Sequence, residues 1–335
     1  MSARKSIVPV FVPHLGCPNH CVFCNQHEIS GSSEAATPET VRLALSSAQA
    51  YTTCAELAFY GGSFTAVSAE QQRALLAAAQ PWRESGFLCS IRVSTRPDCI
   101  DEAAVALLKE YGVETVELGA QSMSDKVLRA SGRGHSAENT VRAAELLKAS
   151  GFRLILQMMT GLPGSDAESD LDTAKRLAAL APDGVRIYPT VILKDTALER
   201  LWREGAYQPH SVEDAVSRCI PIVRLFQEKK IPIIRLGLNP TEELGGGMAL
   251  AGAYHPALGE LIYSGLFREK AEQLLRRMER VPKRAVLLVN RSDISKMTGQ
   301  KRTNLRYLRE TFGIQELFVK AGEIDSGLIA ISEIL

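Results

Sequence analysis

The chain has 335 residues, of which 45% are hydrophobic and 23% are charged, and its formal net charge is +1. This composition is ordinary for a globular protein and excludes a largely disordered chain, while seven cysteines in this length exclude a small disulfide-stapled scaffold. The length favours a large domain with an appendage, and no apolar run approaches the ~18 residues of a membrane span.

Strands and helices are predicted to alternate along the chain. The predicted strands, with a candidate seventh at the end, are Ile7–Val12, Glu56–Tyr60, Leu88–Ser94, Thr115–Leu118, Arg153–Met158, Gly184–Tyr188 and Pro232–Leu236. The predicted helices are Pro38–Tyr51 with Thr37 as N-cap, one capped by Ser68-Ala-Glu-Gln71, Asp101–Glu110, Ala137–Ser150, one capped by Ser165-Asp-Ala-Glu168 and ending near Leu180, and Val212–Lys229. Strands separated by helices of about 10–15 residues imply parallel βαβ units. We therefore predict an α/β fold, a partial TIM-like (β/α)6 barrel whose active site lies at the C-terminal strand ends.

Three cysteines follow the first predicted strand within eight residues. Cys17, Cys21 and Cys24 form a Cys-x3-Cys-x2-Cys run. Because a cluster that only transfers electrons usually has four thiolate ligands, three predict an iron–sulfur cluster with one iron open to a small molecule. Zinc remains an alternative, since a nearby histidine could complete a Cys3His site. The candidate histidines are His14, His20 and His27.

The other four cysteines are scattered without Cys-x2-Cys spacing. They are Cys54, Cys89, Cys99 and Cys219. We expect small buried thiols at these positions and no second cluster.

Small and polar residues follow three of the predicted strands at corresponding positions. The segments are Tyr60-Gly-Gly-Ser-Phe64, Glu117-Leu-Gly-Ala-Gln-Ser122 and Gln157-Met-Met-Thr-Gly-Leu-Pro-Gly164. Each segment alone fits an ordinary turn or a polar strand end, but paired glycines also let a ligand approach the backbone closely. Together, at one edge of one sheet, the three segments predict a single pocket.

These segments and the cysteine run resemble the radical SAM superfamily, and within it the Elp3-type branch, which shares features with the oxygen-independent coproporphyrinogen oxidases. The resemblance covers approximately residues 5–260. Further segments that carry it are Ser94-Thr-Arg-Pro-Asp98, Gly132-Arg-Gly-His135, Arg186-Ile-Tyr-Pro-Thr190 and Leu201-Trp-Arg-Glu-Gly205. It implies a [4Fe–4S] cluster on the three cysteines, S-adenosylmethionine (SAM) on the open iron, and an electron donor such as flavodoxin or ferredoxin. Reductive cleavage of SAM would then give a 5′-deoxyadenosyl radical.

The resemblance also implies which residues contact SAM. They are Phe23, Gly61, Gly62, Ser63, Gln121, Arg133, Gln157 and Tyr188. The two glycines and the serine would meet the amino group through main-chain atoms, the aromatic residues would approach the adenine, and Gln121 and Arg133 would contact the ribose and carboxylate ends. The chain departs from relatives at Ser94, where a carboxylate is common, and at Gln157, where His or Asp is common, so the resemblance says less about the reaction than about the cofactor.

The tail from Phe267 onward is basic. Between Arg268 and Arg309, 13 Lys and Arg residues stand against 4 Asp and Glu residues, an excess of +9. The predicted elements are a strand Ala285–Val289, a helical turn Ile294–Met297, a loop Gly299–Arg302, a helix Thr303–Thr311 and a strand Glu316–Lys320. This order resembles the KH module, whose Gly-x-x-Gly loop clamps a nucleic-acid backbone, although Arg302 replaces the second glycine. Lys301, Arg302 and Arg306 are the candidate RNA contacts, and a purely structural cap is the alternative.

We therefore predict a radical SAM core in residues 1–265 and a small basic α+β module in residues 266–335. The leading function is modification of tRNA or ribosomal RNA by a cytoplasmic enzyme without a membrane partner, acting alone or with a partner protein. We expect the chain to lack the acetyltransferase domain of Elp3. One alternative is small-molecule radical chemistry of the coproporphyrinogen-oxidase type. Another is a non-catalytic RNA-binding protein with a redox-sensing cluster.

Overall fold

The structure is a computed structural model that describes residues 5–12, 17, 21–25, 36–239 and 244–333. The chain divides into two compact units. The barrel unit comprises Met1–His210 and Leu225–Tyr254, and the C-terminal unit comprises Ser211–Arg224 and His255–Leu335. The boundary predicted after residue 265 falls inside helix α11 (Leu258–Arg277), and it stays a prediction.

The barrel unit is built on a seven-stranded sheet with the order β1-β2-β3-β4-β5-β6-β8. Every neighbouring pair in this sheet is parallel. The strands are β1 (Ser6–Phe11), β2 (Ala55–Tyr60), β3 (Leu88–Thr95), β4 (Thr115–Gln121), β5 (Arg153–Thr160), β6 (Gly184–Pro189) and β8 (Ile233–Leu236). The predicted partial barrel is confirmed, and the candidate seventh strand forms as β8. Because all strands are parallel, their C-terminal ends meet at one edge.

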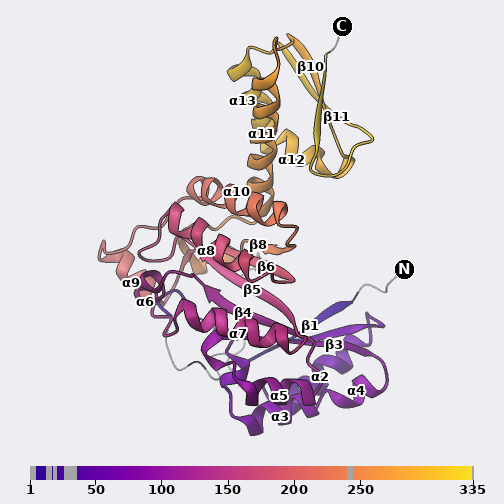
Figure 1. Cartoon of the computed structure of the whole chain (residues 1–335), viewed down its shortest axis with the longest axis vertical. Helices are drawn as coiled ribbons and strands as arrows, with labels where there is room; N and C mark the ends of the chain where they lie inside the picture. Colours follow the sequence, from indigo (N-terminus) through magenta and orange to yellow (C-terminus); the bar gives the residue numbers. More distant parts are fainter. Residues whose placement is uncertain (1–4, 13–16, 18–20, 26–35, 240–243, 334–335) are drawn as a thin grey trace. The chain divides into compact units, whose positions relative to one another are not determined.

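Helices connect the strands of the barrel unit, as Figure 1 shows. They are α2 (Pro38–Ala48), α3 (Ala69–Ala77), α4 (Gln80–Glu84), α5 (Glu102–Glu110), α6 (Asp125–Ala130), α7 (Ala137–Ala149), α8 (Ala167–Ala179), α9 (Ala197–Arg203) and α10 (Val212–Glu228). Residues 212–224 of α10 belong to the C-terminal unit, and its remaining residues belong to the barrel unit. Thr37 is the N-cap of α2, as predicted, and it forms a capping box with Thr40 that was not predicted. The prediction of Ser165 as the start of α8 was wrong by one residue, because the carboxylate of Asp166 accepts from the Ser169 backbone N–H. Among the helices of the described residues, none has the length and apolar character needed to cross a bilayer.

Side chains of the first strand alternate between the two faces of the sheet. Val8 and Val10 are each 2% exposed. Ile7, Pro9 and Phe11, on the opposite face, line a cavity. The inner face of the curved sheet is therefore where the functional groups must be sought. A second, two-stranded sheet in this unit, β7 (Val191–Leu193) with β9 (Ala249–Gly252), is antiparallel and was not predicted.

In the C-terminal unit, which also includes residues 212–224 of α10, further helices pack against a three-stranded sheet. The strands are β10 (Arg284–Val289), β11 (Glu316–Ala321) and β12 (Ile329–Glu333), in the order β11-β10-β12, and the helices besides α11 are α12 (Ile294–Thr298) and α13 (Thr303–Phe312). Strand β10 is parallel to β11 and antiparallel to β12. Their core includes Leu275, Leu287, Met297 and Leu308. The predicted strand–helix–helix–strand order is confirmed, whereas α11 and β12 were not predicted.

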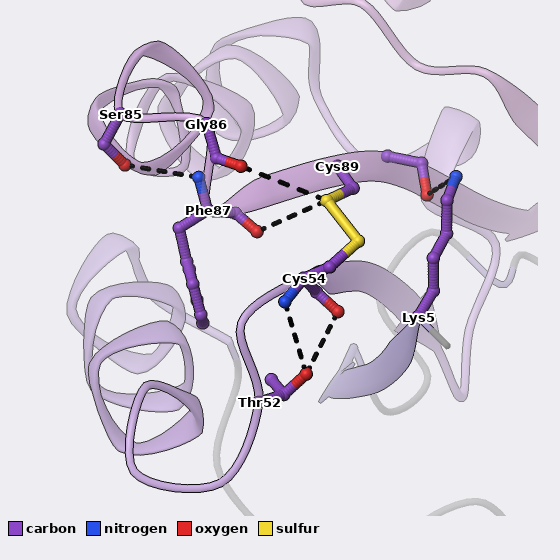
Figure 2. Close-up of a disulfide and its surroundings, with 8 residues drawn as sticks. Lys5, Thr52, Cys54, Ser85, Gly86, Phe87 and Cys89 are labelled. Carbon is purple, nitrogen blue, oxygen red and sulfur yellow. Dashed lines mark hydrogen bonds between the residues drawn. A yellow bond between two sulfur atoms is a disulfide. The ribbon is translucent and has the colours of Figure 1, made fainter. Parts of the chain in front are cut away.

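One disulfide corrects the prediction for the scattered cysteines. Cys54 and Cys89 are bonded, with their Cα atoms 5.7 Å apart, and Figure 2 shows that they join the starts of β2 and β3. Ala55 pairs with Leu88 and Glu56 with Ser90, so Cys89 is an extra residue in its strand. Such a bulge re-aims a side chain, and no cysteine spacing rule anticipates it.

The disulfide should stabilise the folded protein. Closing a loop between residues 35 positions apart is worth about 4 kcal/mol in the chain-entropy estimate. The protein with the disulfide intact should therefore unfold at a higher midpoint urea concentration than the protein whose disulfide has been reduced with dithiothreitol. A Cys54→Ser/Cys89→Ser variant serves as the control and should unfold alike in both conditions. If the parent protein has the same midpoint with and without dithiothreitol, a stabilising disulfide between these cysteines is contradicted.

Candidate active site

A cavity of about 570 Å³ lies on the inner face of the barrel unit. Ten of the eleven residues predicted to hold the cluster or SAM line it, namely Cys17, Cys21, Phe23, Cys24, Gly61, Gly62, Gln121, Arg133, Gln157 and Tyr188. Ser63 is the exception. The volume is within the range of small-molecule sites, about 300–1,000 Å³.

The three thiols lie on a segment that is tied to two helices. The backbone N–H of Val22 donates to Ser131 O (3.0 Å), and Val22 O accepts from Leu198 N (2.7 Å). Burial raises the pKa of the Cys17 thiol and Cys21 adds to the rise, while Arg133 opposes it. Arg133 therefore offsets only part of the rise, and the pKa of Cys17 stays above its ordinary value.

The zinc alternative depended on histidines that lie outside the described residues: His14, His20 and His27. Among the residues that the structure does describe, no three Cys, His, Asp or Glu side chains are grouped to hold a single metal ion.

The loop after β2 is fixed onto the end of β3. Gly61 has φ of 90°, a conformation that favours glycine. Ser63 is fully buried, and its Oγ lies 2.9 Å from Thr95 Oγ1 and accepts from Arg96 N (3.2 Å). Its side chain thus anchors the glycine loop below the cavity, and the main-chain contact predicted for it stays a prediction.

Arg133 lies across the end of β4. Its Nη1 donates to Cys21 Sγ (3.3 Å) and its Nη2 donates to Gly119 O (2.5 Å). A Cβ at Gly119 would lie 2.9 Å from Arg133 Nη2 and 3.0 Å from Gln121 Nε2, closer than such atoms pack. The absence of a side chain at Gly119 therefore lets the guanidinium reach the cysteine segment.

Two glutamines extend this arrangement to the next strand. Gln121 has φ of 63°, a strained value for a residue other than glycine, and the ladder between β4 and β5 shifts register here. Its Oε1 accepts from Gln157 Nε2 (3.2 Å). The predicted contacts Gln121, Arg133 and Gln157 are thus brought together on one wall.

The loop that carries Arg133 is held by a buried histidine. Burial lowers the pKa of His135 to about 4, so the ring is neutral near pH 7. Its Nε2 lies 3.3 Å from Ala120 O. Arg133 and His135 thereby bind consecutive carbonyls at the end of β4.

A buried charge network borders the cavity through Glu117 and Arg186 and was missed by sequence reasoning. Glu117 pairs with Arg92 (2.6 Å) and with Arg186 (2.9 Å), and Arg92 also pairs with Glu56 (2.8 Å). Two carboxylates thus balance two guanidiniums, as burial requires. Charged residues at alternate positions of otherwise buried strands were the signal that would have found this network.

Two tyrosines contact Arg186 of this network. Arg186 Nη2 lies 3.3 Å from the Tyr60 hydroxyl, and Arg186 Nη1 lies 3.5 Å from that of Tyr188. Burial and the nearby Glu117 raise the pKa of Tyr60 to about 12. Both rings line the cavity, so they offer hydroxyl groups and flat surfaces for an aromatic group.

Comparison with known proteins decides which chemistry this geometry serves. The sequence profile of the radical SAM superfamily matches residues 11–177, and that of the radical SAM C-terminal domain matches residues 182–268. The chain belongs to the radical SAM superfamily. It is therefore a radical SAM enzyme, and its cofactors are a [4Fe–4S] cluster and SAM. The cluster prediction is confirmed over the zinc alternative.

The similar curated proteins belong to the Elp3 group, as the motifs predicted. The chain is 32% identical over 174 residues to the tRNA uridine(34) acetyltransferase of Methanocaldococcus infernus, covering 51% of this chain and 32% of that protein. It is 33% identical over 138 residues to Elongator complex protein 3 of Homo sapiens, covering 40% and 25%. The chain therefore spans about a third or less of these relatives.

Solved structures show the same fold. The archaeal Elp3 of Methanocaldococcus infernus superimposes with a TM-score of 0.64 at 24% identity, covering 80% of this chain and 64% of that chain. Coproporphyrinogen III oxidase of Escherichia coli gives a TM-score of 0.53 at 19% identity, covering 68% and 53%. At these identities the likeness concerns the fold alone.

The residues present fit the two cofactors. Three thiols and two guanidiniums, Arg96 and Arg133, line one cavity, which suits an anionic cluster and a carboxylate. Within the described chain, Arg96 Nη1 and Arg133 Nε are buried without a hydrogen-bond partner. We keep as predictions the individual assignments of Cys17, Cys21 and Cys24 to iron and of the cavity residues to SAM.

Replacing one cluster cysteine should remove the cluster. A Cys24→Ala protein leaves two thiolates, too few to hold four irons. After anaerobic reconstitution, the parent should contain about four irons per chain and the variant far fewer. A Cys99→Ala control should retain the parent's iron content. Full iron in the Cys24→Ala protein would refute the assignment.

Replacing Arg133 should weaken SAM binding. A hydrogen bond to a charged group is worth about 1.5–3 kcal/mol, so Arg133→Ala should raise the SAM dissociation constant roughly 10- to 150-fold. Equilibrium binding to the reconstituted protein measures this. The exposed Arg129 on α6 gives a matched control, Arg129→Ala, with unchanged affinity. If the two variants bind SAM equally well, Arg133 does not hold the carboxylate.

Proposed function

We propose that this radical SAM enzyme modifies RNA, with tRNA as the first candidate substrate and ribosomal RNA as the second. The observation that carries the proposal is the 32% identity over 174 residues to a tRNA uridine(34) acetyltransferase. The matched region is about half of this chain, and the whole relative is much longer. The similarity therefore supports the kind of substrate and leaves the transferred group open.

The cavity suits a nucleobase. When bound, the cluster and SAM supply a 5′-deoxyadenosyl radical. Tyr60 offers an aromatic face and a hydroxyl, and Glu117 with Arg186 offers hydrogen-bond acceptors and donors in a charge-balanced pair. RNA bases displaced from a helix are bound in this way, by stacking on aromatic rings and by hydrogen bonds to their edges.

The C-terminal unit offers a separate surface for the RNA backbone. Lys301, Arg302 and Arg306 are exposed, and no ion pair found among the described residues engages them. Lys301 and Arg302 have φ values of 49° and 61°, a strained conformation of the kind found at binding sites. They precede α13 in the strand–helix–helix–strand order that resembles a KH module. The proposed nucleic-acid-binding part is residues 266–335.

We further propose a cytoplasmic enzyme that receives its electron from a flavodoxin or ferredoxin and acts alone or with a partner protein. A small-molecule reaction of the coproporphyrinogen-oxidase type remains the second candidate, because the barrel fold is shared with that enzyme. It gives no role to the basic C-terminal surface.

Neutralising the basic loop should weaken RNA binding without affecting the cofactors. A Lys301→Ala/Arg302→Ala/Arg306→Ala protein loses about three phosphate contacts, so the slope of log affinity against log salt for single-stranded RNA should fall by about 2, at roughly 0.7 per contact. Tight tRNA binding and tRNA-stimulated formation of 5′-deoxyadenosine should be reduced. Formation of 5′-deoxyadenosine without RNA should be unchanged.

The matched control removes three exposed charges from barrel helices: Lys109→Ala, Arg142→Ala and Lys175→Ala. It should bind tRNA with nearly the parent's salt slope. If the loop variant binds tRNA with the parent's affinity and salt slope, the assignment of this loop as the RNA-binding surface is wrong. If coproporphyrinogen is consumed and tRNA leaves SAM cleavage unchanged, the second candidate is favoured.

A further inference from the structure

Arg96 is a buried cation whose hydrogen bonds are only partly satisfied. It follows β3, is 2% exposed and ranks among the largest fully buried side chains. Its Nε and Nη2 donate to the two carboxylate oxygens of Asp98, at 3.0 and 2.9 Å. Within the described residues, its Nη1 is buried and has no hydrogen-bond partner. A buried donor of this kind is rare in a folded protein, because leaving it unpaired is costly.

The position of this free donor is well defined. Asp98 holds the guanidinium plane in a two-point pair, and the Arg96 backbone N–H is bonded to Ser63 Oγ. Arg96 lines the cavity together with Cys17, Cys21 and Cys24. The thiol of Cys99, which does not belong to the Cys-x3-Cys-x2-Cys run, also lies beside the Arg96 side chain.

Arg133 is the other guanidinium near these sulfurs, and its bonding differs. Both Nη atoms of Arg133 have partners, Cys21 Sγ and Gly119 O. Arg96 follows β3, whereas Arg133 lies between α6 and α7, and only Arg96 has an Nη atom without a hydrogen-bond partner among the described residues. An acceptor for Nη1 must be anionic or strongly polar and must reach a site beside the cysteines.

We propose that Arg96 donates through Nη1 to an anionic sulfur of the bound [4Fe–4S] cluster, a cysteine thiolate or a bridging sulfide, and thereby raises the reduction potential of the cluster. The reduced cluster carries one more negative charge than the oxidised cluster. A hydrogen bond and a positive charge at its sulfurs therefore stabilise the reduced form more. Asp98 acts through Arg96 as a positioning residue.

The test is the midpoint potential of the cluster, measured by EPR-monitored redox titration of the anaerobically reconstituted protein without SAM. Arg96→Gln should make reduction at least tenfold less favourable, a downward shift of about 59 mV or more for one electron, at the parent's iron content. Arg96→Lys keeps the positive charge but loses the planar guanidinium. The midpoint potential of this variant should therefore shift in the same direction by a smaller amount. Cys99→Ala should leave the potential unchanged, because the acceptor is the cluster.

The SAM carboxylate is the competing acceptor, and the titration excludes it by omitting SAM. Arg96→Gln with full iron and an unchanged potential overturns the proposal, and a SAM affinity at least tenfold weaker in that same protein assigns Arg96 to SAM. Should Arg96→Gln fail to hold iron, Arg96→Lys decides: a potential equal to that of the parent overturns the proposal. None of these outcomes depends on whether the enzyme acts on RNA.

Discussion

The inner face of the barrel unit depends on Glu117, a carboxylate that forms ion pairs with two guanidiniums at once. Arg92 on the neighbouring strand and Arg186 two strands away both bond to it. A parallel sheet is normally apolar on both faces, so these charged side chains, with Glu56 as the second carboxylate, are stable inside it only as a paired set. Removing Glu117 would take the carboxylate from Arg186 and leave Arg92 with Glu56 alone. The network thereby fixes the relative positions of β3, β4 and β6 below the cavity.

Polar groups above this network are gathered by the topology rather than by sequence proximity. Cys21, Gly119, Gln157 and Tyr188 are far apart in the chain, yet all reach one cavity. The order of the strands places successive strand ends side by side. The loop after each strand therefore lines part of the same cavity. The cofactor site is thus a property of the sheet edge, and the individual loops supply its chemistry.

Much of this could be predicted from the sequence, because the evidence was local. Strand spans, the cap at Thr37 and the small residues after β2 follow from short-range rules, and family motifs located the cavity residues. The start of α8 was misplaced because Ser165 and Asp166 are both good N-caps, and only geometry distinguishes them. The Cys54–Cys89 bond depends on a bulge that no local rule anticipates. The pairing of Glu117 with Arg186 joins residues 69 positions apart, which a single sequence cannot reveal.

A missing methyl group at Gly119 links two sides of the cavity. The space above this residue holds Arg133 Nη2 on one side and Gln121 Nε2 on the other. A side chain there would make the ends of both side chains shift, the guanidinium that bonds to Cys21 and the amide group that bonds to Gln157. The cysteine segment and the end of β5 therefore both depend on the absence of a side chain at Gly119. Larger replacements at this position should disturb the two sides more than smaller ones.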